Sequence, residues 1–255
     1  MIAIISDIHG NYDALSAVLE EAEALRADRF ICLGDLVGYG PEPVRCVDEV
    51  RGRCELTLCG NHDFALIYGA NNFSPLAQDT LERHRSDMMP RPGDPVAYEE
   101  RRQRWEFIKG LPYRHVRRDR LFVHAAPRNP IMEYLRKVDV ILGMDEKVSE
   151  NLRQVDWLCF IGHTHQPGII TRSMEFLSPD DVHGVYQPRP HEKAIINVGS
   201  VGQPRDGDWR ACFVTVEEDA TVRYHRVAYD LEAASRKLAA AGTDEAMAER
   251  LRRGR

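Results

Sequence analysis

The feature that most constrains this chain is the alternation of short apolar runs with helical segments at its start. The runs IAIIS at 2–6, FICL at 30–33 and LTLC at 56–59 are nearly free of polar residues, as strands buried on both faces of a sheet require. Apolar residues at helical spacing predict an amphipathic helix over 12–27, and a second helix is expected over 42–52. Strand, helix, strand, helix, strand is the order typical of a parallel sheet with right-handed crossovers.

The buried-strand pattern returns after residue 120, in RLFVHAAP and WLCFIGHTHQP. The shorter segments GIITRS, AIINVGS, ACFVTVE and TVRYHRV follow, and their alternation favours antiparallel pairing. A helix is expected in DLEAASRKLAAAG, with Asp230 as its N-cap and Gly242 as its stop, and the tail AERLRRGR is predicted to be a solvated helix end. One domain over 1–255 is expected, because a chain of this length can bury one large core.

The stretch from about 66 to 117 interrupts this order. It is polar, holds PRPGDP near its middle and contains the expected helix YEERRQRWEFIKGL. Two interpretations stay open. The stretch is either a lid or specificity insertion beside the site, or a solvated excursion on the surface.

Composition limits the partners. A chain with 43% hydrophobic and 29% charged residues is an ordinary globular protein. Its formal net charge of -6 disfavours nucleic acid as a bulk substrate, although a short single-stranded end stays open. Any phosphate-bearing partner would need a local cationic site, such as a metal. No apolar stretch approaches the ~18 residues of a membrane span and no basic region precedes the first apolar run, so we expect a cytoplasmic protein without membrane contact. The oligomeric state is unknown from sequence.

Cysteine usage points to the same compartment. The six cysteines are scattered without CxxC pairing, and several lie inside apolar runs. We interpret them as small buried hydrophobes in a reducing compartment, with thiolate ligation as the alternative.

Polar side chains follow five of the expected strands, at the sheet edge where parallel sheets bind ligands. These residues are Asp7, His9, Asp35, Asn61, His62, His124, His163 and His165. Taken singly, each has a simpler explanation, such as a helix cap for Asp7, a turn for Asn61 or a satisfied core position for His124. Burying so many carboxylates and imidazoles together without a counter-charge is costly, so the repetition predicts bound cations.

The donor types narrow the choice of metal. Oxygen and imidazole donors without thiolate favour Mn, with Fe, Zn, Co or Ni as alternatives, over a cysteine-rich structural zinc. Eight donor-capable residues exceed what one ion can use. Two divalent ions that share one carboxylate are therefore expected.

The motifs SDIHGN, GDLVGYGP, GNHD, VHAAP, GHTHQP and NVGSVGQPRDGD, in this order, resemble the calcineurin-like metallophosphoesterase superfamily. They look most like its small bacterial and archaeal phosphodiesterases, and the resemblance runs from about residue 3 to residue 208. It implies an α/β fold, a four-layer αββα sandwich of two mixed sheets flanked by helices. It also implies a dinuclear metal site at the carboxyl ends of the strands.

The resemblance assigns roles position by position. Asp7, His9 and His165 would hold the first metal, Asn61, His124 and His163 the second, and Asp35 would bridge both. Such ions lie ~3.5–4 Å apart and generate hydroxide for in-line attack on phosphorus. His62 resembles the family's general acid, a role that contributes on the order of 10²–10⁴-fold.

Two departures from the phosphoprotein phosphatase branch bear on the substrate. In that branch the second motif is GDxVDRG, and its second Asp and its Arg are replaced here by Gly38 and Tyr39. The Arg that follows the GNHE motif of that branch is also absent, because Phe64 and Ala65 stand there instead. Without these guanidinium clamps a monoanionic diester is favoured over a dianionic monoester. The group that orients His62 is left open, with Asp63 or a backbone carbonyl as candidates.

Other residues carry weaker signals. Arg205 and Arg128 are either substrate contacts or structural surface residues. The histidines without a motif around them are expected on the surface or in the core, and they are His84, His115, His183, His191 and His225.

The sequence therefore predicts a metallophosphoesterase, a phosphodiesterase for a small phosphodiester or nucleotide. Hydrolysis of dinucleoside polyphosphates or of phosphomonoesters is the alternative. A non-catalytic scaffold that retains the metal site is disfavoured by the presence of His62.

Overall fold

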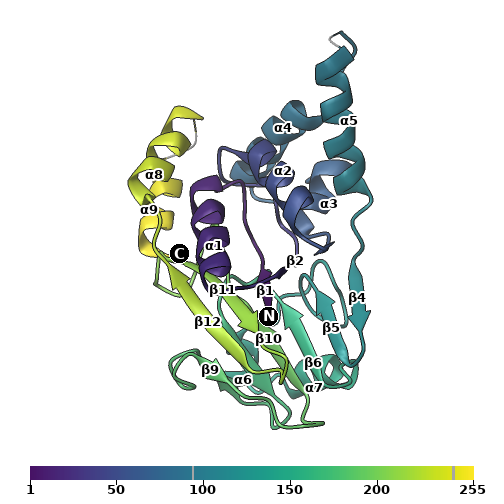
Figure 1. Ribbon diagram of the computed structural model, residues 1–255, viewed down its shortest axis with the longest axis vertical. Coiled ribbons are helices and arrows are strands. Elements are labelled where there is room, and N and C mark those ends of the chain that lie inside the picture. The colour runs from purple at the N-terminus through teal and green to yellow at the C-terminus, as the bar shows by residue number, and fades with distance from the viewer. Residues whose placement is uncertain (94, 243–244) are drawn as a thin grey trace.

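The computed structural model describes residues 1–93, 95–242 and 245–255. These residues form two six-stranded mixed sheets that pack face to face, with helices on the outer faces (Figure 1). The four-layer sandwich expected from the motifs is confirmed.

The first sheet has the strand order β3-β2-β1-β11-β12-β9. Its strands are β1 (Ile2–Ile5), β2 (Arg29–Cys32), β3 (Leu56–Thr57), β9 (Val185–Tyr186), β11 (Ala211–Val216) and β12 (Val222–Val227). β1, β2 and β3 pair in parallel, as the sequence predicts. β11 lies antiparallel beside β1 and joins the later part of the chain to this unit.

The second sheet has the order β4-β5-β6-β10-β7-β8. Its strands are β4 (Arg114–Arg117), β5 (Arg120–Val123), β6 (Leu158–Ile161), β7 (Gly168–Thr171), β8 (Phe176–Leu177) and β10 (Ala194–Asn197). The prediction of antiparallel pairing for AIINVGS is wrong on one side, because β10 pairs antiparallel with β7 but parallel with β6. The chain passes through β8 and β9 before it returns as β10 between β6 and β7, and this crossover gives the parallel pair.

Helices cover both outer faces. They are α1 (Tyr12–Ala24), α2 (Pro43–Arg53), α3 (Asn61–Tyr68), α4 (Pro75–Met88), α5 (Pro95–Lys109), α6 (Lys137–Ile141), α7 (Asp145–Arg153), α8 (Leu231–Ala240) and α9 (Glu245–Arg253). Asp230 caps α8 as expected, since its side chain accepts a hydrogen bond from the Ala233 amide at 2.8 Å. None of the described helices combines the length and the apolar character needed to cross a bilayer.

The space between the sheets is filled by large apolar side chains from both of them. Ile4 and Val214 of the first sheet meet Phe160 and Ile196 of the second, and Phe122 stacks on Phe160 with ring centroids 5.4 Å apart. This core fixes the two sheets relative to each other, and with them the loops at their strand ends.

The chain end differs from its prediction as a solvated helix end. α9 buries Met247, Ala248 and Leu251, and Leu251 joins the same cluster as Ala234 and Leu238 of α8. Three apolar residues on one face of a helix are enough to dock it when a neighbouring helix offers a matching face.

The segment from 66 to 117 contains α4 and α5, which extend away from the sheets at one end of the molecule (Figure 1). The inner face of α4 is buried and contributes Leu81 and Met88 to the core that includes α1 and α2. α4 is therefore not a purely solvated helix on the surface.

Candidate metal centre

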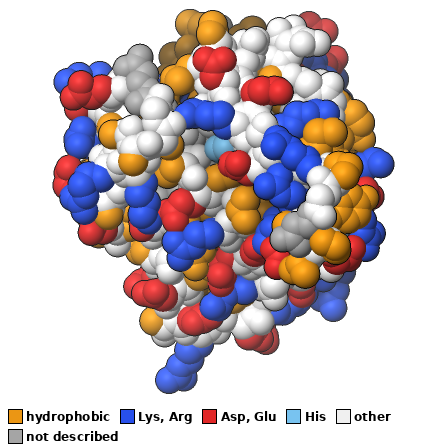
Figure 2. All heavy atoms as spheres, turned by 90° about the horizontal axis from the view of Figure 1, so that it is seen from above, with side chains coloured by type: hydrophobic (Ala, Val, Ile, Leu, Met, Phe, Trp, Pro, Cys, Tyr) orange, Lys and Arg blue, Asp and Glu red, His pale blue; other side chains and the backbone are white. Residues whose placement is uncertain are grey.

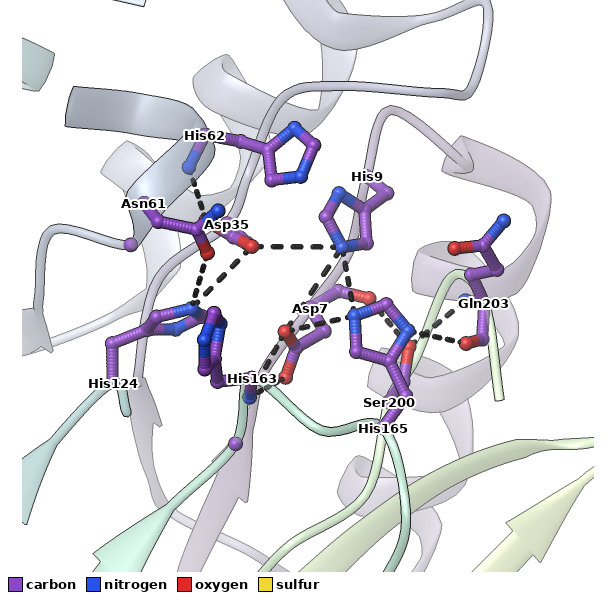
Figure 3. Close-up of polar contacts among 12 residues, drawn as sticks. Asp7, His9, Asp35, Asn61, His62, His124, His163, His165, Ser200 and Gln203 are labelled. Atoms are coloured by element: carbon purple, nitrogen blue, oxygen red, sulfur yellow. Dashed lines mark hydrogen bonds and ion pairs between the residues drawn. The ribbon is translucent and has the colours of Figure 1, made fainter. Parts of the chain in front are cut away.

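All eight polar residues that the sequence singles out at strand ends are buried, and the fold brings them together (Figure 3). They come from the loops after β1, β2, β5 and β6 and from the start of α3. The loops are joined through the backbone, because the Asp7 amide donates to the Gly34 carbonyl at 3.0 Å and the His9 amide to the Asp35 carbonyl at 2.9 Å. The main chain thus sets the positions of the side chains.

The backbone of these loops adopts the left-handed conformation at an unusual number of non-glycine residues. In the cluster they are Asp7 (φ 53°), His9 (φ 50°), Asp35 (φ 56°), His163 (φ 63°) and His165 (φ 59°). Few L-residues adopt such angles, and they concentrate at functional sites where the surrounding structure enforces them.

Three imidazoles are oriented by main-chain carbonyls. Each carbonyl receives the hydrogen bond of an Nδ1–H group: Val37 O from His9 at 2.9 Å, Leu33 O from His124 at 3.1 Å, and Gln203 O from His165 at 2.5 Å. Since a carbonyl only accepts, the proton of each neutral ring is on Nδ1. The Nε2 atoms therefore point into the cluster, and in the neutral rings they present lone pairs there, as in histidines that bind a metal. The carboxylate of Asp35 outweighs burial and raises the pKa of His124 to about 9, so a metal at that ring would displace a proton.

On one side of the cluster, His9 Nε2 lies 3.1 Å from His165 Nε2, and His165 Nε2 lies 3.2 Å from an oxygen of Asp7. Burial lowers the pKa of His9 and of His165, which favours their neutral forms. Two lone pairs that face each other at this distance repel unless a cation lies between them. This donor set therefore fits a metal ion.

The other side contains His124, Asn61 and His163. His124 Nε2 lies 3.1 Å from Asn61 Oδ1, and the His124 and His163 rings are 5.0 Å apart. His163 Nε2 is buried, and no hydrogen-bond partner for it occurs in the described part of the chain. A buried nitrogen without a partner is costly, and a second ion would satisfy it.

Asp35 lies between the two sides. Its Oδ2 is 3.6 Å from His9 Nε2 and 3.4 Å from His124 Nε2, while its Oδ1 accepts the His62 amide at 2.8 Å. Burial opposes its ionisation, but the neighbouring imidazoles, His124 foremost, hold the pKa of Asp35 well below its usual range. An ionised carboxylate in this place can reach ions on both sides.

Among the residues that the structure describes, three groups have donor atoms that all lie within 4.8 Å of one another. They are Asp7 with His9 and His165, His9 with Asp35 and His62, and Asp35 with His124 and His163. The first and third together contain all the residues assigned to metals by their motifs except Asn61. The same arrangement explains why His163 and His165 flank Thr164, since their rings serve opposite sides of Asp35.

The ring of His62 packs among three other rings. It packs against Tyr39, His9 and Phe73 with centroid distances of 4.8, 4.7 and 4.9 Å. Its Nδ1 is buried and without a hydrogen-bond partner among the described residues, so neither candidate orienting group contacts that atom. A Cβ on Gly38 would overlap this nitrogen, and burial lowers the pKa of His62 to about 4.

Asp63 was considered as the group that orients His62, but its carboxylate bonds main-chain amides instead. Its carboxylate accepts from the amides of Asp35 at 2.7 Å, Leu36 at 2.9 Å and Gly60 at 3.0 Å. It therefore connects the start of α3 to the loop after β2. The sequence did carry a signal for this role, because an acidic residue three positions after an N-cap can accept the N-cap amide, which is one half of a capping box.

Two further residues have positions that the motifs do not reveal. Tyr134 stacks on His163 with centroids 3.9 Å apart, although no motif surrounds it. Arg128 pairs with Glu133 and Glu150, so it has the structural surface role rather than that of a free substrate contact.

The unassigned histidines include one with a structural part in the site. Buried His84 accepts the Gly38 amide at 3.1 Å through Nδ1, and His225 bonds Thr215 at 2.8 Å. His115, His183 and His191 lie outside the cluster.

Two mixed sheets with buried imidazoles and carboxylates at their strand ends define the class of metal-dependent phosphoester hydrolases. Sequence comparison agrees, because the family model described as calcineurin-like phosphoesterase matches residues 1–197. The chain belongs to the calcineurin-like phosphoesterase family. This family binds a dinuclear metal centre, and the cluster supplies candidate ligands for one.

Individual relatives cover the whole chain. An uncharacterized protein of Methanocaldococcus jannaschii is 32% identical over 266 residues, which is 100% of this chain and 98% of that protein. The crystal structure of a metallophosphoesterase from Sphaerobacter thermophilus is similar with a TM-score of 0.83 and 35% identity, covering 100% of this chain and 98% of the other. A hypothetical protein from Pyrococcus horikoshii shares the fold, with a TM-score of 0.74 and 18% identity, over 100% and 99% of the two chains.

Proposed function

We propose that this phosphoester hydrolase is a phosphodiesterase that acts on a small phosphodiester or nucleotide. The observation that carries the proposal is the convergence of imidazole Nε2 atoms from both sides on the carboxylate of Asp35. Mn²⁺ is the favoured ion, and Fe, Zn, Co or Ni are ions that the same donors accept.

Seven side chains would hold the two ions. Asp7, His9 and His165 would bind one, Asn61, His124 and His163 the other, and Asp35 both. When bound, such ions polarise the phosphoryl oxygens and make a water molecule acidic enough to be a nucleophile at neutral pH. The Nδ1 hydrogen bonds to carbonyls keep the imidazoles aimed at the ions.

His62 would serve as the general acid. Its ring lies beside His9 and Tyr39, and its main-chain amide is fixed on Asp35, so it lies next to the proposed ligands. An imidazolium there can donate its proton to the oxygen that leaves phosphorus. The substrate's negative charge would favour that protonated form.

The substrate class follows from what flanks the metals. Gly38 and Tyr39 occupy the positions where the phosphatase branch has an Asp and an Arg, which supports a diester over a monoester. One observation favours the second candidate, a dinucleoside polyphosphate hydrolase. A bis(5'-nucleosyl)-tetraphosphatase of Nitrosococcus oceani is 37% identical over 84 residues, although these are only 31% of this chain and 30% of that protein.

Location belongs to the same proposal. All six cysteines are unpaired, and burial raises the pKa of Cys54 and of Cys212 to about 12. Inert buried thiols support the expectation of a reducing compartment such as the cytoplasm.

The test compares leaving groups in protein loaded with Mn²⁺. p-Nitrophenolate leaves readily without a proton, whereas a nucleoside alkoxide does not. The His62→Asn variant should therefore lose on the order of 10²–10⁴-fold in kcat on a nucleoside diester and far less on bis(p-nitrophenyl) phosphate. His191→Asn, at an exposed position, is the matched control.

Equal losses on both substrates would show that His62 has a role other than proton donation. A wild-type protein that hydrolyses no phosphodiester after loading with Mn, Fe, Zn, Co or Ni in turn would refute the proposed activity.

A further inference from the structure

In the described part of the chain, two arginines on segments beside the candidate metal centre have no carboxylate partner. Arg205 follows β10 in the motif NVGSVGQPRDGD, and Arg250 lies in α9. Within residues 1–93, 95–242 and 245–255, no Asp or Glu side chain pairs with either of them. Arg128, Arg210 and Arg226, by contrast, each bind a carboxylate.

Arg205 is fixed to the loop that carries a proposed metal ligand. Its amide donates to the His165 carbonyl at 3.1 Å, and its Nη2 donates to Gln203 Oε1 at 2.7 Å. The main-chain oxygen of Gln203 is the acceptor for His165 Nδ1. Arg205 Nε is buried and has no hydrogen-bond partner in the described structure, so a donor is still available there.

Tyr39 connects the guanidinium groups to the cluster. Its ring lies 4.8 Å from the rings of His9 and His62, and Arg205 Cζ lies 5.8 Å from its centroid. Arg250 lies in α9, whose end is bonded to the loop of Arg205, because the Gly207 amide donates to the Gly254 carbonyl at 3.0 Å. Burial, and then the charge of Arg205, lower the pKa of Arg250.

α9 holds Arg250 in this place. Met247 and Leu251 of α9 line a pocket together with His9, Tyr39 and Gln203, so the helix packs directly beside the metal loops. Arg250 Nη1 contacts Met247 Sδ at 3.9 Å, and its Nε donates to the main-chain oxygen of Arg255 at 3.3 Å. The helix that the sequence predicts as a solvated end thus holds Arg250 against a residue that lines this pocket.

Two partly buried guanidinium groups on neighbouring segments raise the free energy of the protein unless an anion binds near them. Guanidinium groups bind phosphate through paired hydrogen bonds, which makes a phosphoryl group the matching ligand. Seen from above, a histidine side chain lies in a hollow with Lys and Arg side chains around it and some Asp or Glu side chains among them (Figure 2).

We propose that Arg205 and Arg250 form a second anion subsite, which binds a phosphoryl group of the substrate other than the one that is hydrolysed. The part of this inference that concerns substrate choice rests on the proposed function. The subsite would favour those small phosphodiesters and nucleotides that contain a chain of phosphoryl groups. The two arginines would supply, from other elements, guanidinium groups that the motifs around Gly38 and Phe64 lack.

The kinetic test uses Arg250→Gln in the full chain loaded with Mn²⁺. We expect kcat/KM for diadenosine tetraphosphate to fall roughly 10- to 100-fold, as for the loss of a hydrogen bond to a charged group, and kcat/KM for bis(p-nitrophenyl) phosphate to stay within about 2-fold. Arg253→Gln is the control, since this exposed residue of the same helix pairs with Glu249 and should leave both values unchanged. Equal losses on both substrates, or no loss on either, would overturn the inference.

A binding test separates this inference from the proposed function. Inorganic pyrophosphate is titrated by calorimetry into protein kept in EDTA, so that no turnover is needed. Wild-type protein should bind it, and Arg205→Gln and Arg250→Gln should each weaken binding roughly 10-fold or more with unchanged melting temperatures. Absent binding, or binding that neither substitution weakens, refutes the subsite and leaves the proposed function standing. Arginine-dependent binding in a protein without hydrolytic activity would instead support the subsite and refute the proposed function.

Discussion

At the scale of single residues, the site depends on left-handed backbone conformations that residues other than glycine rarely adopt. Asp7, Asp35 and His163 are among the cluster residues with positive φ, and each such residue costs about 1–3 kcal/mol at a strained position. The hydrogen bonds between the loops after β1 and β2 offset part of this cost. The chain retains an arrangement that is unfavourable locally because it aims carboxylates and imidazoles at one point.

Position 60 requires glycine because the main chain around Asp35 is crowded. A Cβ there would overlap both the carboxylate and the main-chain nitrogen of Asp35. Gly60→Ala should therefore displace Asp35, weaken metal binding and lower the free energy of unfolding by about 1–3 kcal/mol, as overpacking does.

The control is Gly52→Ala. Gly52 lies in α2, and a Cβ there has no heavy atom within 4 Å, so alanine should stabilise the helix by about 0.5–1 kcal/mol. Urea unfolding of both variants gives the two values. A Gly60→Ala protein as stable as wild type, with full metal content, would contradict the crowding argument.

The residues of the site were predictable to different degrees. The eight polar residues were recognised because each follows a strand, and that position is visible in the sequence. Tyr134 and Phe73 were not, because they contact the site from outside the motifs and only the folded chain shows their neighbours. That the seven proposed ligands bind metal stays a prediction.

At the scale of secondary-structure elements, Asp63 decides how α3 meets the loop after β2. Its carboxylate accepts three main-chain amides at 2.7–3.0 Å, and an asparagine offers only one oxygen to them. Asp63→Asn would place an N–H group against N–H donors, and each unsatisfied group would lower the free energy of unfolding by about 1–3 kcal/mol. We expect a lower urea midpoint and weaker metal binding.

Asp180→Asn provides the comparison, because Asp180 is exposed and should change stability by less than about 0.5 kcal/mol. If the two substitutions have equal effects on unfolding, Asp63 does not join these elements in the way described.

The elements themselves show where sequence patterns suffice. β1, β2 and β3 were predicted because continuous apolar runs with helices between them leave few alternatives. The parallel partner of β10 was not, because pairing depends on where a crossover returns and not on the strand's own residues. The packing of α9 was not predicted, because most of its residues are polar and only a narrow face of the helix is apolar. That the 66–117 segment forms a lid stays a prediction, although its Phe73 packs on His62.

At the scale of the whole molecule, two sheets share one core and bring loops from both to a common edge. The cluster joins them, since His9 and Asp35 follow strands of the first sheet, and His124 and His165 follow strands of the second. Ions held between the sheets would bind the folded state only. Metal binding should therefore stabilise the entire fold.

Thermal unfolding measures this coupling. At free Mn²⁺ about 100-fold above its dissociation constant, one site adds about 2.7 kcal/mol, which corresponds to a melting temperature roughly 5–10 °C higher than in EDTA. The Asp35→Asn variant should show a much smaller difference. A melting temperature that EDTA does not change would mean that the cluster binds no ion.

The most direct measurement is the number of metal ions bound per chain, determined by mass spectrometry of the purified protein after Mn²⁺ loading and removal of free ions. We expect about two Mn per wild-type chain and at most one in Asp35→Asn, because that substitution removes the charge shared by both ions. A wild-type protein that holds fewer than one ion, or an Asp35→Asn variant that still holds two, would contradict a dinuclear centre bridged by Asp35.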